Sequence, residues 1–182
     1  SGSTNWSTQT SVTFSPTTAW FAPDNNSVGT AYLDMAFNVG IGTGSELAFY
    51  HQYDTENNYD GGQVFISTDE GETWIDLGPN MITNGYNNVI FNSVPGFSGN
   101  SNGFINTVID LDEYSGQNVR IRFKMNCDQS VGGAGWWIDD IAISNLRLIT
   151  TNEAAGNNGT YFSKTFSNSV EILSPSTLLQ AN

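Results

Sequence analysis

The residues best able to coordinate a cation lie in one acidic segment, 51–62, with the sequence HQYDTENNYDGG. Its carboxylates are those of Asp54, Glu56 and Asp60, and three side-chain amides and two glycines accompany them. Calcium takes about six to eight oxygen ligands and often mixes carboxylates, amide oxygens and backbone carbonyls. The segment lacks the spacing and the closing Glu of an EF-hand loop, so it predicts a calcium loop of another kind. The alternative is an acidic turn that water alone solvates.

A second acidic group lies inside an apolar run, 135–141, with the sequence GWWIDDI. Side chains alternate between the faces of a strand, so Asp139 and Asp140 point to opposite faces and at least one points inward or to a strand edge. A buried carboxylate needs a cation or several hydrogen-bond donors. Because the chain has few Lys and Arg residues, a metal ion is the more economical partner. Backbone N–H groups are the alternative.

Residues that could carry catalysis are scarce. His51 is the only histidine, which excludes metal sites built on several histidines, and its place within a strand predicts that it packs in or near the core. Cys127 is the only cysteine, so no internal disulfide forms, and we expect an inert thiol. Asp139 and Asp140 cannot form a glycosidase pair, because they face opposite ways. We therefore predict that the chain is not an enzyme, although it could be a fragment of a larger secreted hydrolase.

These residues must be positioned by strands, because short β-rich runs alternate with Gly, Asn, Asp and Ser throughout and helical periodicity is nearly absent. The pattern predicts an all-β sandwich. We expect one domain over residues 1–182, with its core at about 11–149 and extra strands or a linker at 150–182. The turn DEGE at 69–72 predicts a hairpin. The predicted strands are 11–14, 31–38, 45–52, 62–68, 89–92, 104–110, 119–126, 136–145 and 146–149, with a further pair at 161–166 and 170–173.

The charge balance excludes some partners. Five basic residues face 18 acidic ones, for a formal net charge of -13. Nucleic acid would be repelled, an anionic membrane surface is disfavoured, and no apolar run reaches the roughly 20 residues of a membrane helix, so we expect no membrane insertion. Divalent cations are the natural partners of such a surface, although acidity also keeps secreted proteins soluble. No signal peptide is evident and both ends read as polar linker, so we expect neighbouring domains of a larger chain.

Two stretches resemble a known type of module. The first is LAFYHQYDTENNYDGG at 47–62 with VFISTDEGETW at 64–74, and the second is VRIRF at 119–123 with GWWIDDI at 135–141. They are similar to jelly-roll accessory domains of immune inhibitor A-type and fungalysin-type secreted metalloproteases, to gingipain cleaved-adhesin modules and to MAM-like modules. The resemblance covers roughly residues 20–145. It implies a jelly-roll sandwich of galactose-binding or MAM-like topology that holds structural calcium.

The resemblance also implies particular calcium ligands. Glu56 and Asp60 match the acidic positions after the first long strand, Asp139 matches the first acid of the later pattern, and Asp24 matches an early acidic position. Asp128 matches an acidic position to which no role is assigned. Asp54 and Asp140 complete the set of candidate ligands through the residue patterns described above.

The tryptophans suggest what the domain does. Adjacent Trp136 and Trp137 cannot both point inward on a regular strand, so we expect one to be exposed and able to stack on a sugar ring or a peptide side chain. We therefore predict a calcium-stabilised adhesin or binding module of a secreted or cell-surface bacterial protein, with a carbohydrate or polypeptide as its ligand. The alternative is a purely structural accessory domain of a secreted metalloprotease.

Overall fold

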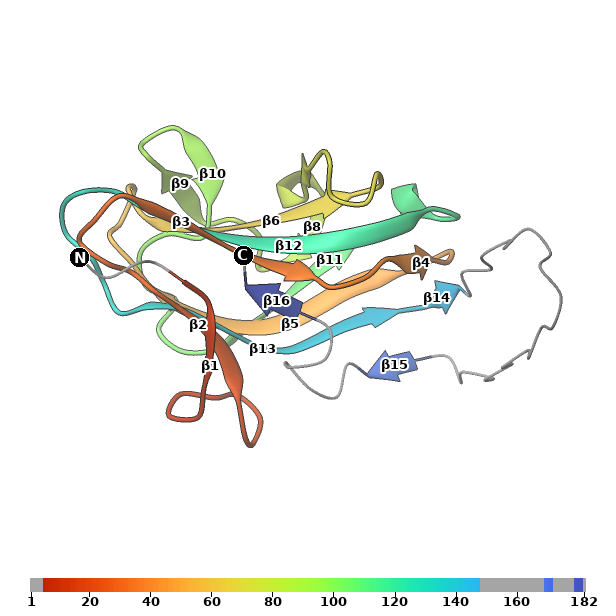
Figure 1. The fold of residues 1–182 in the computed structure, drawn as a ribbon, viewed down its shortest axis with the longest axis horizontal. Helices are drawn as coiled ribbons and strands as arrows, with labels where there is room; N and C mark the ends of the chain where they lie inside the picture. Colours follow the sequence, from red (N-terminus) through yellow and green to blue (C-terminus); the bar gives the residue numbers. More distant parts are fainter. Residues whose placement is uncertain (1–4, 148–168, 172–178, 182) are drawn as a thin grey trace, which may run out of the picture.

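The computed structural model describes residues 5–147, 169–171 and 179–181. In this part of the chain, strands and two short 3-10 helices form all the regular structure (Figure 1). None of the described helices is long and apolar enough to cross a membrane. The strands are β1 (Ser7–Gln9), β2 (Ala19–Pro23), β3 (Gly29–Met35), β4 (Val39–Ile41), β5 (Glu46–Asp54), β6 (Gly61–Ser67), β7 (Ile75–Asp76), β8 (Met81–Thr83), β9 (Asn88–Ile90), β10 (Val94–Gly96), β11 (Ile105–Asp110), β12 (Asn118–Cys127), β13 (Gly135–Ser144), β14 (Leu146–Arg147), β15 (Ser169–Glu171) and β16 (Leu179–Ala181), and the helices are η1 (Gly78–Asn80) and η2 (Asp112–Tyr114).

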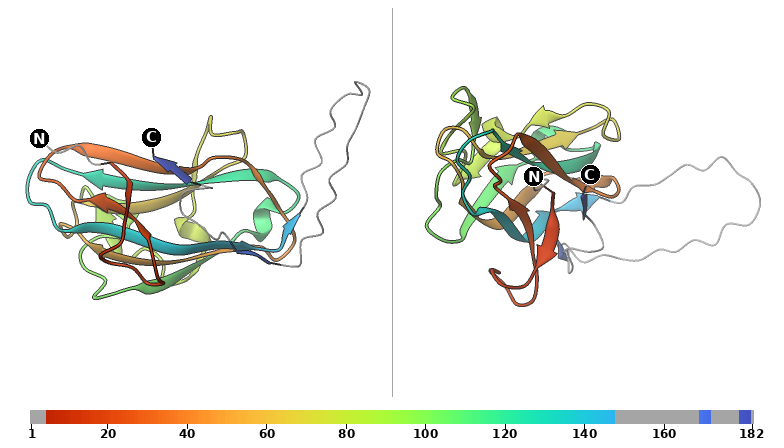
Figure 2. Two further views of the ribbon diagram at one scale, coloured as in Figure 1. Left: turned by 60° about the horizontal axis from the view of Figure 1, so that its bottom comes forward. Right: turned by 60° about the vertical axis from the view of Figure 1, so that its left-hand side comes forward.

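The strands form two antiparallel sheets that pack face to face, as the two layers in Figure 2 show. The first sheet has the order β1-β2-β13-β5-β11-β8, and β15 also pairs with β13. In the second sheet β12 is central: it pairs with β6 along one edge and with β3 and β4 along the other. Beyond β6 the sheet continues with β7. On the other side β16 pairs with β3, and β14 pairs with β4. A separate hairpin is made by β9 and β10. The all-β, jelly-roll-like sandwich predicted from the sequence is confirmed.

Alternation along the strands builds the core between the sheets. In β12 every second side chain, from Val119 to Met125, is buried, while Arg120, Arg122 and Lys124 occupy the other face. Strand β5 alternates in the same way in the opposite layer. Burial of apolar area at roughly 25 cal/mol per Å² stabilises this arrangement. The inward and outward assignment made for 119–125 is therefore correct.

The centre of the core is aromatic. The ring centroid of Trp136 lies 5.4 Å from that of Trp6 and 6.0 Å from that of Phe123. The indole also lies against the backbone of Gly62, where a Cβ atom would come within 2.4 Å of the ring. A glycine is needed here because the indole occupies the space of a side chain.

The N-terminal strands differ from the prediction. Residues 11–14 form no strand, and β1 and β2 lie on either side of them. The side-chain Oε1 of Gln9 accepts hydrogen bonds from the backbone N–H groups of Ser11 and Val12, at 2.7 and 3.0 Å, which turns the chain. The predicted strand at 89–92 ends at Ile90, because Phe91 and Asn92 form the hairpin turn with φ of 51° and 55°. The strand expected at 161–166 lies outside the described residues.

Candidate metal centre

Three loops meet at one end of the sandwich, toward the left in Figure 1. Residues 24–28 join β2 to β3, residues 55–60 join β5 to β6, and residues 128–134 join β12 to β13. Each loop passes from one sheet to the other. Pairing of Gly135 with both Pro23 and Asp54 brings the strand ends that carry these loops side by side.

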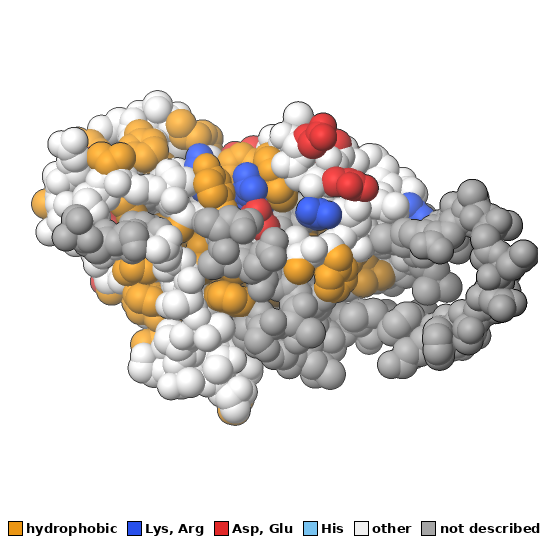
Figure 3. Space-filling model, in the orientation of Figure 1, with side chains coloured by type: hydrophobic (Ala, Val, Ile, Leu, Met, Phe, Trp, Pro, Cys, Tyr) orange, Lys and Arg blue, Asp and Glu red, His pale blue; other side chains and the backbone are white. Residues whose placement is uncertain are grey.

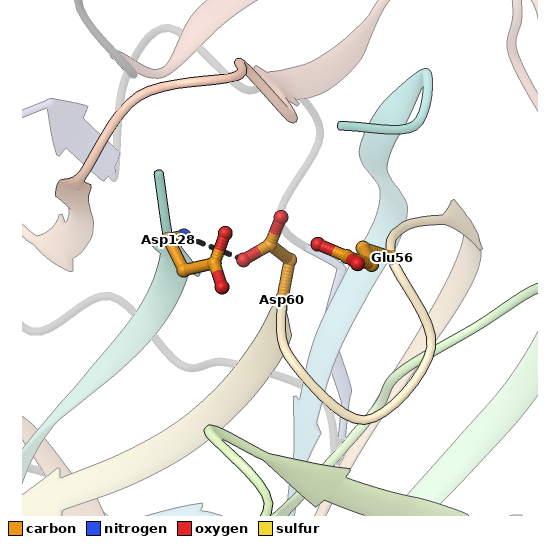
Figure 4. A group of neighbouring side chains, drawn as sticks. All are labelled: Glu56, Asp60 and Asp128. Carbon is orange, nitrogen blue, oxygen red and sulfur yellow. Dashed lines mark hydrogen bonds between the residues drawn. The ribbon is translucent and has the colours of Figure 1, made fainter. Parts of the chain in front are cut away.

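The loops bring three carboxylates together. Glu56, Asp60 and Asp128 each offer an oxygen, and these oxygens lie within 4.8 Å of one another (Figure 4). Oδ1 of Asp60 accepts the backbone N–H of Asp128 at 2.6 Å. The hydroxyl of Ser130 lies 3.0 Å from Oε2 of Glu56 and 3.1 Å from Oδ1 of Asp128. The carboxylates are thus held in place by the loops that carry them.

A fourth carboxylate, that of Asp24 in the first loop, lies beside Asp60 but outside the group of three whose oxygens are within 4.8 Å of one another. Its Oδ2 accepts the backbone N–H groups of Glu56 and Gly133, at 3.1 and 2.8 Å. Its Oδ1 is buried and has no hydrogen-bond partner, and the same is true of Oδ2 of Asp60. The two residues are only 5% and 1% exposed. Leaving such oxygens unsatisfied is costly, and either a cation or a proton shared by the Asp24 and Asp60 carboxyls would relieve that cost.

The electrostatics of the site favour a cation. Desolvation by burial, the neighbouring Asp24 carboxyl and the charge of Asp128 together raise the pKa of Asp60 to about 8, although the backbone N–H of Asp128 opposes them. Within the described residues, no Lys, Arg or His side chain pairs with these four carboxylates. An all-oxygen donor set of this kind suits calcium better than zinc or copper. The residues present therefore fit a calcium ion.

Glycines allow the third loop to lie flat against the other two. A Cβ atom on Gly133 would come within 2.3 Å of the carbonyl oxygen of Asp54, and one on Gly132 within 2.5 Å of the carbonyl oxygen of Asp24. The backbone N–H of Gly132 also donates a hydrogen bond to Oδ1 of Asn26 at 2.7 Å. A larger side chain at either glycine would push the loop, and with it Asp128, away from the site.

Three of the six ligands expected from the sequence lie apart from this cluster. Asp139 is buried, and its carboxylate accepts the backbone N–H groups of Phe14, Ser15 and Asp140, at 2.8, 3.2 and 2.8 Å. Asp140 is exposed and accepts the hydroxyl of Ser15 at 2.7 Å. Asp54 accepts the side-chain amide of Asn100 at 2.9 Å. Asp139 thus has the hydrogen-bonded environment that was the alternative to a metal.

The structure adds one residue that the sequence left without a role. Asp128 joins Glu56 and Asp60 because β12 ends at Cys127, next to the loop that follows β5. In the sequence, Asp128 is recognisable only as an acid shortly before a glycine-rich turn. That position does not predict which other loops lie beside it.

The expectation that Trp136 or Trp137 is exposed is wrong. Trp136 is 0% and Trp137 is 9% exposed. Alternation does send the two rings to opposite faces, but both faces of the sheet are covered here. Phe21 of β2 stacks on Trp137, with ring centroids 4.7 Å apart. Neither indole offers a free face on which a sugar could stack.

His51 lies in the core, as the sequence predicted. It is fully buried, and desolvation lowers its pKa to about 3. Its Nδ1 accepts the indole N–H of Trp136 at 3.1 Å, and its Nε2 lies 2.8 Å from the hydroxyl of Thr107. That hydroxyl donates to the carbonyl of Asn84, so the neutral tautomer with hydrogen on Nε2 satisfies the whole chain of bonds.

The two-sheet fold and the acidic loop site define a β-sandwich domain of the MAM-like class. The chain matches the immune inhibitor A-like MAM domain family over residues 6–169, and it belongs to that family. It is also similar to bacillopeptidase F of Bacillus subtilis (strain 168), with 26% identity over 99 residues. That alignment covers 54% of this chain but only 6% of bacillopeptidase F, so the chain spans a small part of that relative's length.

Proposed function

We propose that this domain is a calcium-stabilised, non-catalytic accessory module of a larger secreted protein of the protease type. The observation that carries the proposal is the pair of buried oxygens without hydrogen-bond partners, Oδ1 of Asp24 and Oδ2 of Asp60. Without a cation, two buried carboxylates repel one another, and at least one must take up a proton. Calcium would satisfy both oxygens and neutralise the pair.

The positions of the ligands give the ion a structural role. Asp24, Glu56, Asp60 and Asp128 come from three loops, and each loop crosses between the sheets. An ion bound by all of them would join the two layers at one end of the sandwich. Such a link would help a chain whose single cysteine cannot form an internal disulfide.

Two further observations support a role outside catalysis. Both ring nitrogens of His51 are engaged in hydrogen bonds inside the core, and the thiol of Cys127 is buried. Neither side chain can reach a substrate without unfolding. The family and the likeness to part of a peptidase support a place beside a catalytic domain on the same chain. In a secreted protein, the site would need only the calcium affinity of extracellular modules, whose dissociation constants are about 10⁻⁴ to 10⁻³ M.

Thermal unfolding with calcium and with EDTA tests the proposal. At a calcium concentration about a hundred times the dissociation constant, the native state gains about 2.7 kcal/mol, which raises the melting temperature. Asp60→Asn should abolish this increase, because it removes a ligand charge without adding bulk. Glu72→Gln, at an exposed residue away from the site, is the matched control and should keep the increase. Identical melting curves for the wild type in calcium and in EDTA would refute the proposal.

A further inference from the structure

Exposed hydrophobic side chains gather at the end of the sandwich that carries the metal centre. Each ligand loop contributes one, and the β9–β10 hairpin contributes two more. Hydrophobic side chains (orange) over this hairpin are visible in Figure 3. We call this set the apolar rim: Val28 is 71%, Tyr59 39%, Phe91 46%, Val94 40% and Val131 63% exposed.

The apolar rim is tied to the metal centre by hydrogen bonds. Two backbone hydrogen bonds fix the hairpin turn to the second ligand loop. The N–H of Phe91 donates to the carbonyl oxygen of Tyr59 at 3.1 Å, and the N–H of Asn92 donates to that of Asn58 at 2.8 Å. The third loop is fixed to the second through the hydroxyl of Ser130. Movement of the ligand loops would therefore move the apolar rim.

Phe91 shows that the apolar rim is not shaped by stability alone. Its φ of 51° is a left-handed conformation, which costs a residue with a side chain roughly 1–2 kcal/mol and usually selects Asn, Asp or Gly in such a turn. The residue is 46% exposed, so burial in this domain offsets only part of that cost. A bulky apolar side chain held outward in a strained turn is typical of a contact residue for a partner.

The charge around the apolar rim specifies the partner. The three ligand loops and the hairpin, 24–28, 55–60, 128–134 and 88–96, contain no Lys, Arg or His. Their carboxylates include those of Asp24, Glu56, Asp60 and Asp128, so one calcium ion would leave the group with net negative charge. We propose that the apolar rim docks a basic polypeptide surface that carries apolar side chains, and that calcium orders the loops for it. This inference rests on the function proposed above.

Other ligand classes fit less well. An anionic lipid surface would meet an acidic end of a chain whose net charge is -13. A neutral glycan would gain nothing from that charge, and three of the five side chains of the apolar rim are valines, which have no ring for stacking. A partner with Lys or Arg beside Leu or Ile side chains would match both the charge and the exposed apolar area.

Peptide binding to the whole domain tests the inference. The probe is a fluorescent peptide of alternating Lys and Leu, compared with one of Glu and Leu and one of Lys and Ser, by anisotropy in calcium and in EDTA. We expect the Lys-Leu peptide to bind at least tenfold more tightly than either comparison peptide, and to bind more weakly in EDTA. The double variant Val28→Ser, Val131→Ser should weaken binding about tenfold. Ile82→Ser, which removes an aliphatic side chain that is 59% exposed on β8, should not.

A parallel calorimetric titration with calcium alone separates the two proposals. If calcium binds the apolar-rim variant with wild-type affinity while peptide binding falls, the inference is supported. Equal binding of the Lys-Leu and Lys-Ser peptides, or a preference for phosphatidylcholine vesicles or neutral glycans over the Lys-Leu peptide, overturns it while leaving the calcium site intact. If calcium itself fails to bind, the proposed function falls first.

Discussion

The indole N–H of Trp136 donates a hydrogen bond of 3.1 Å to Nδ1 of His51, and both side chains are fully buried. The bond requires an unprotonated Nδ1, so it locks the imidazole in its neutral form. Desolvation acts in the same direction and lowers the pKa of His51 to about 3. The only histidine of the chain is therefore a neutral member of the core at physiological pH.

The first prediction concerns this imidazole. Because the chain has a single histidine, its ring protons give unambiguous NMR signals. In the folded protein we expect no titration of these signals from about pH 8 down to about pH 4, whereas in urea they should titrate with a midpoint near the ordinary value of about 6.5. A midpoint near that value in the folded state would mean that the ring is accessible and that the hydrogen bond to Trp136 does not form.

The second prediction is the effect of His51 on stability. Between its folded pKa of about 3 and its unfolded pKa of about 6.5, the unfolded state binds one more proton. The stability contributed by neutral His51 is complete above about pH 6.5 and is lost as the pH falls toward 3. In metal-free protein Asp60 acts oppositely, because its raised pKa gives the folded state the extra proton.

Removing the Asp60 titration isolates the histidine. In Asp60→Asn we expect the free energy of unfolding to rise by about 1.4 kcal/mol per pH unit between about pH 5 and pH 6, measured by urea denaturation. The wild type in EDTA should show a flatter profile, since the two groups nearly cancel there. A flat profile in Asp60→Asn would show that His51 protonates in the folded state.

The third prediction is that calcium displaces a proton. With a pKa raised to about 8 by burial and by Asp24, Asp60 holds its proton at pH 7 in the metal-free protein. Calcium requires the ionised carboxylate, so binding should release up to one proton, and the apparent dissociation constant should fall as much as tenfold per pH unit between about pH 6 and pH 8. Calorimetry in two buffers with different ionisation enthalpies measures the proton count. Binding without proton release would place the ion away from Asp60.

The fourth prediction separates Asp139 from the metal centre. Asp139→Ala removes a carboxylate that accepts three backbone N–H groups, and we expect a loss of about 2–4 kcal/mol. The loss should be equal in calcium and in EDTA, because the cluster of Glu56, Asp60 and Asp128 remains. Urea denaturation in both media measures it. If the calcium-dependent gain disappears in Asp139→Ala, Asp139 is a ligand.

The fifth prediction tests the packing of the core. Gly62→Ala places a methyl group within about 2.4 Å of the ring of Trp136, and overpacking of this kind costs about 1–3 kcal/mol. Gly85→Ala is the control, since Gly85 is exposed and its nearest contact would be at 3.2 Å. It should change stability by less than about 0.5 kcal/mol. Equal effects in denaturation would mean that Trp136 is free to move.

The fold was predictable because it depends on local patterns. Alternation such as that in β12 and the turn at 69–72 follow from period-two hydrophobicity and glycine chemistry, and both appear in the structure. Glu56 and Asp60 were predictable as neighbours, since they share one loop. The contributions of Asp24 and Asp128 depend on which strand ends meet, and the partners of Asp139 depend on a loop more than a hundred residues away in the chain. No local pattern encodes those contacts.

The tryptophans failed as a binding site for a related reason. Alternation correctly separates Trp136 from Trp137, but it does not reveal whether the outer face is covered. Phe21, which covers Trp137, belongs to a strand that the sequence pattern missed. The exposed apolar side chains lie instead on the loops.

Because each of the three loops crosses between the sheets, binding of an ion at the proposed site would bear on how long the protein survives. Without an ion, mutual repulsion of the carboxylates would loosen three connections at the same end, and loosened loops are where proteases cut first. If the module lies beside a peptidase domain on the same chain, as we propose, digestion by that peptidase would be a hazard. The calcium content of the surroundings would then set the lifetime of the domain.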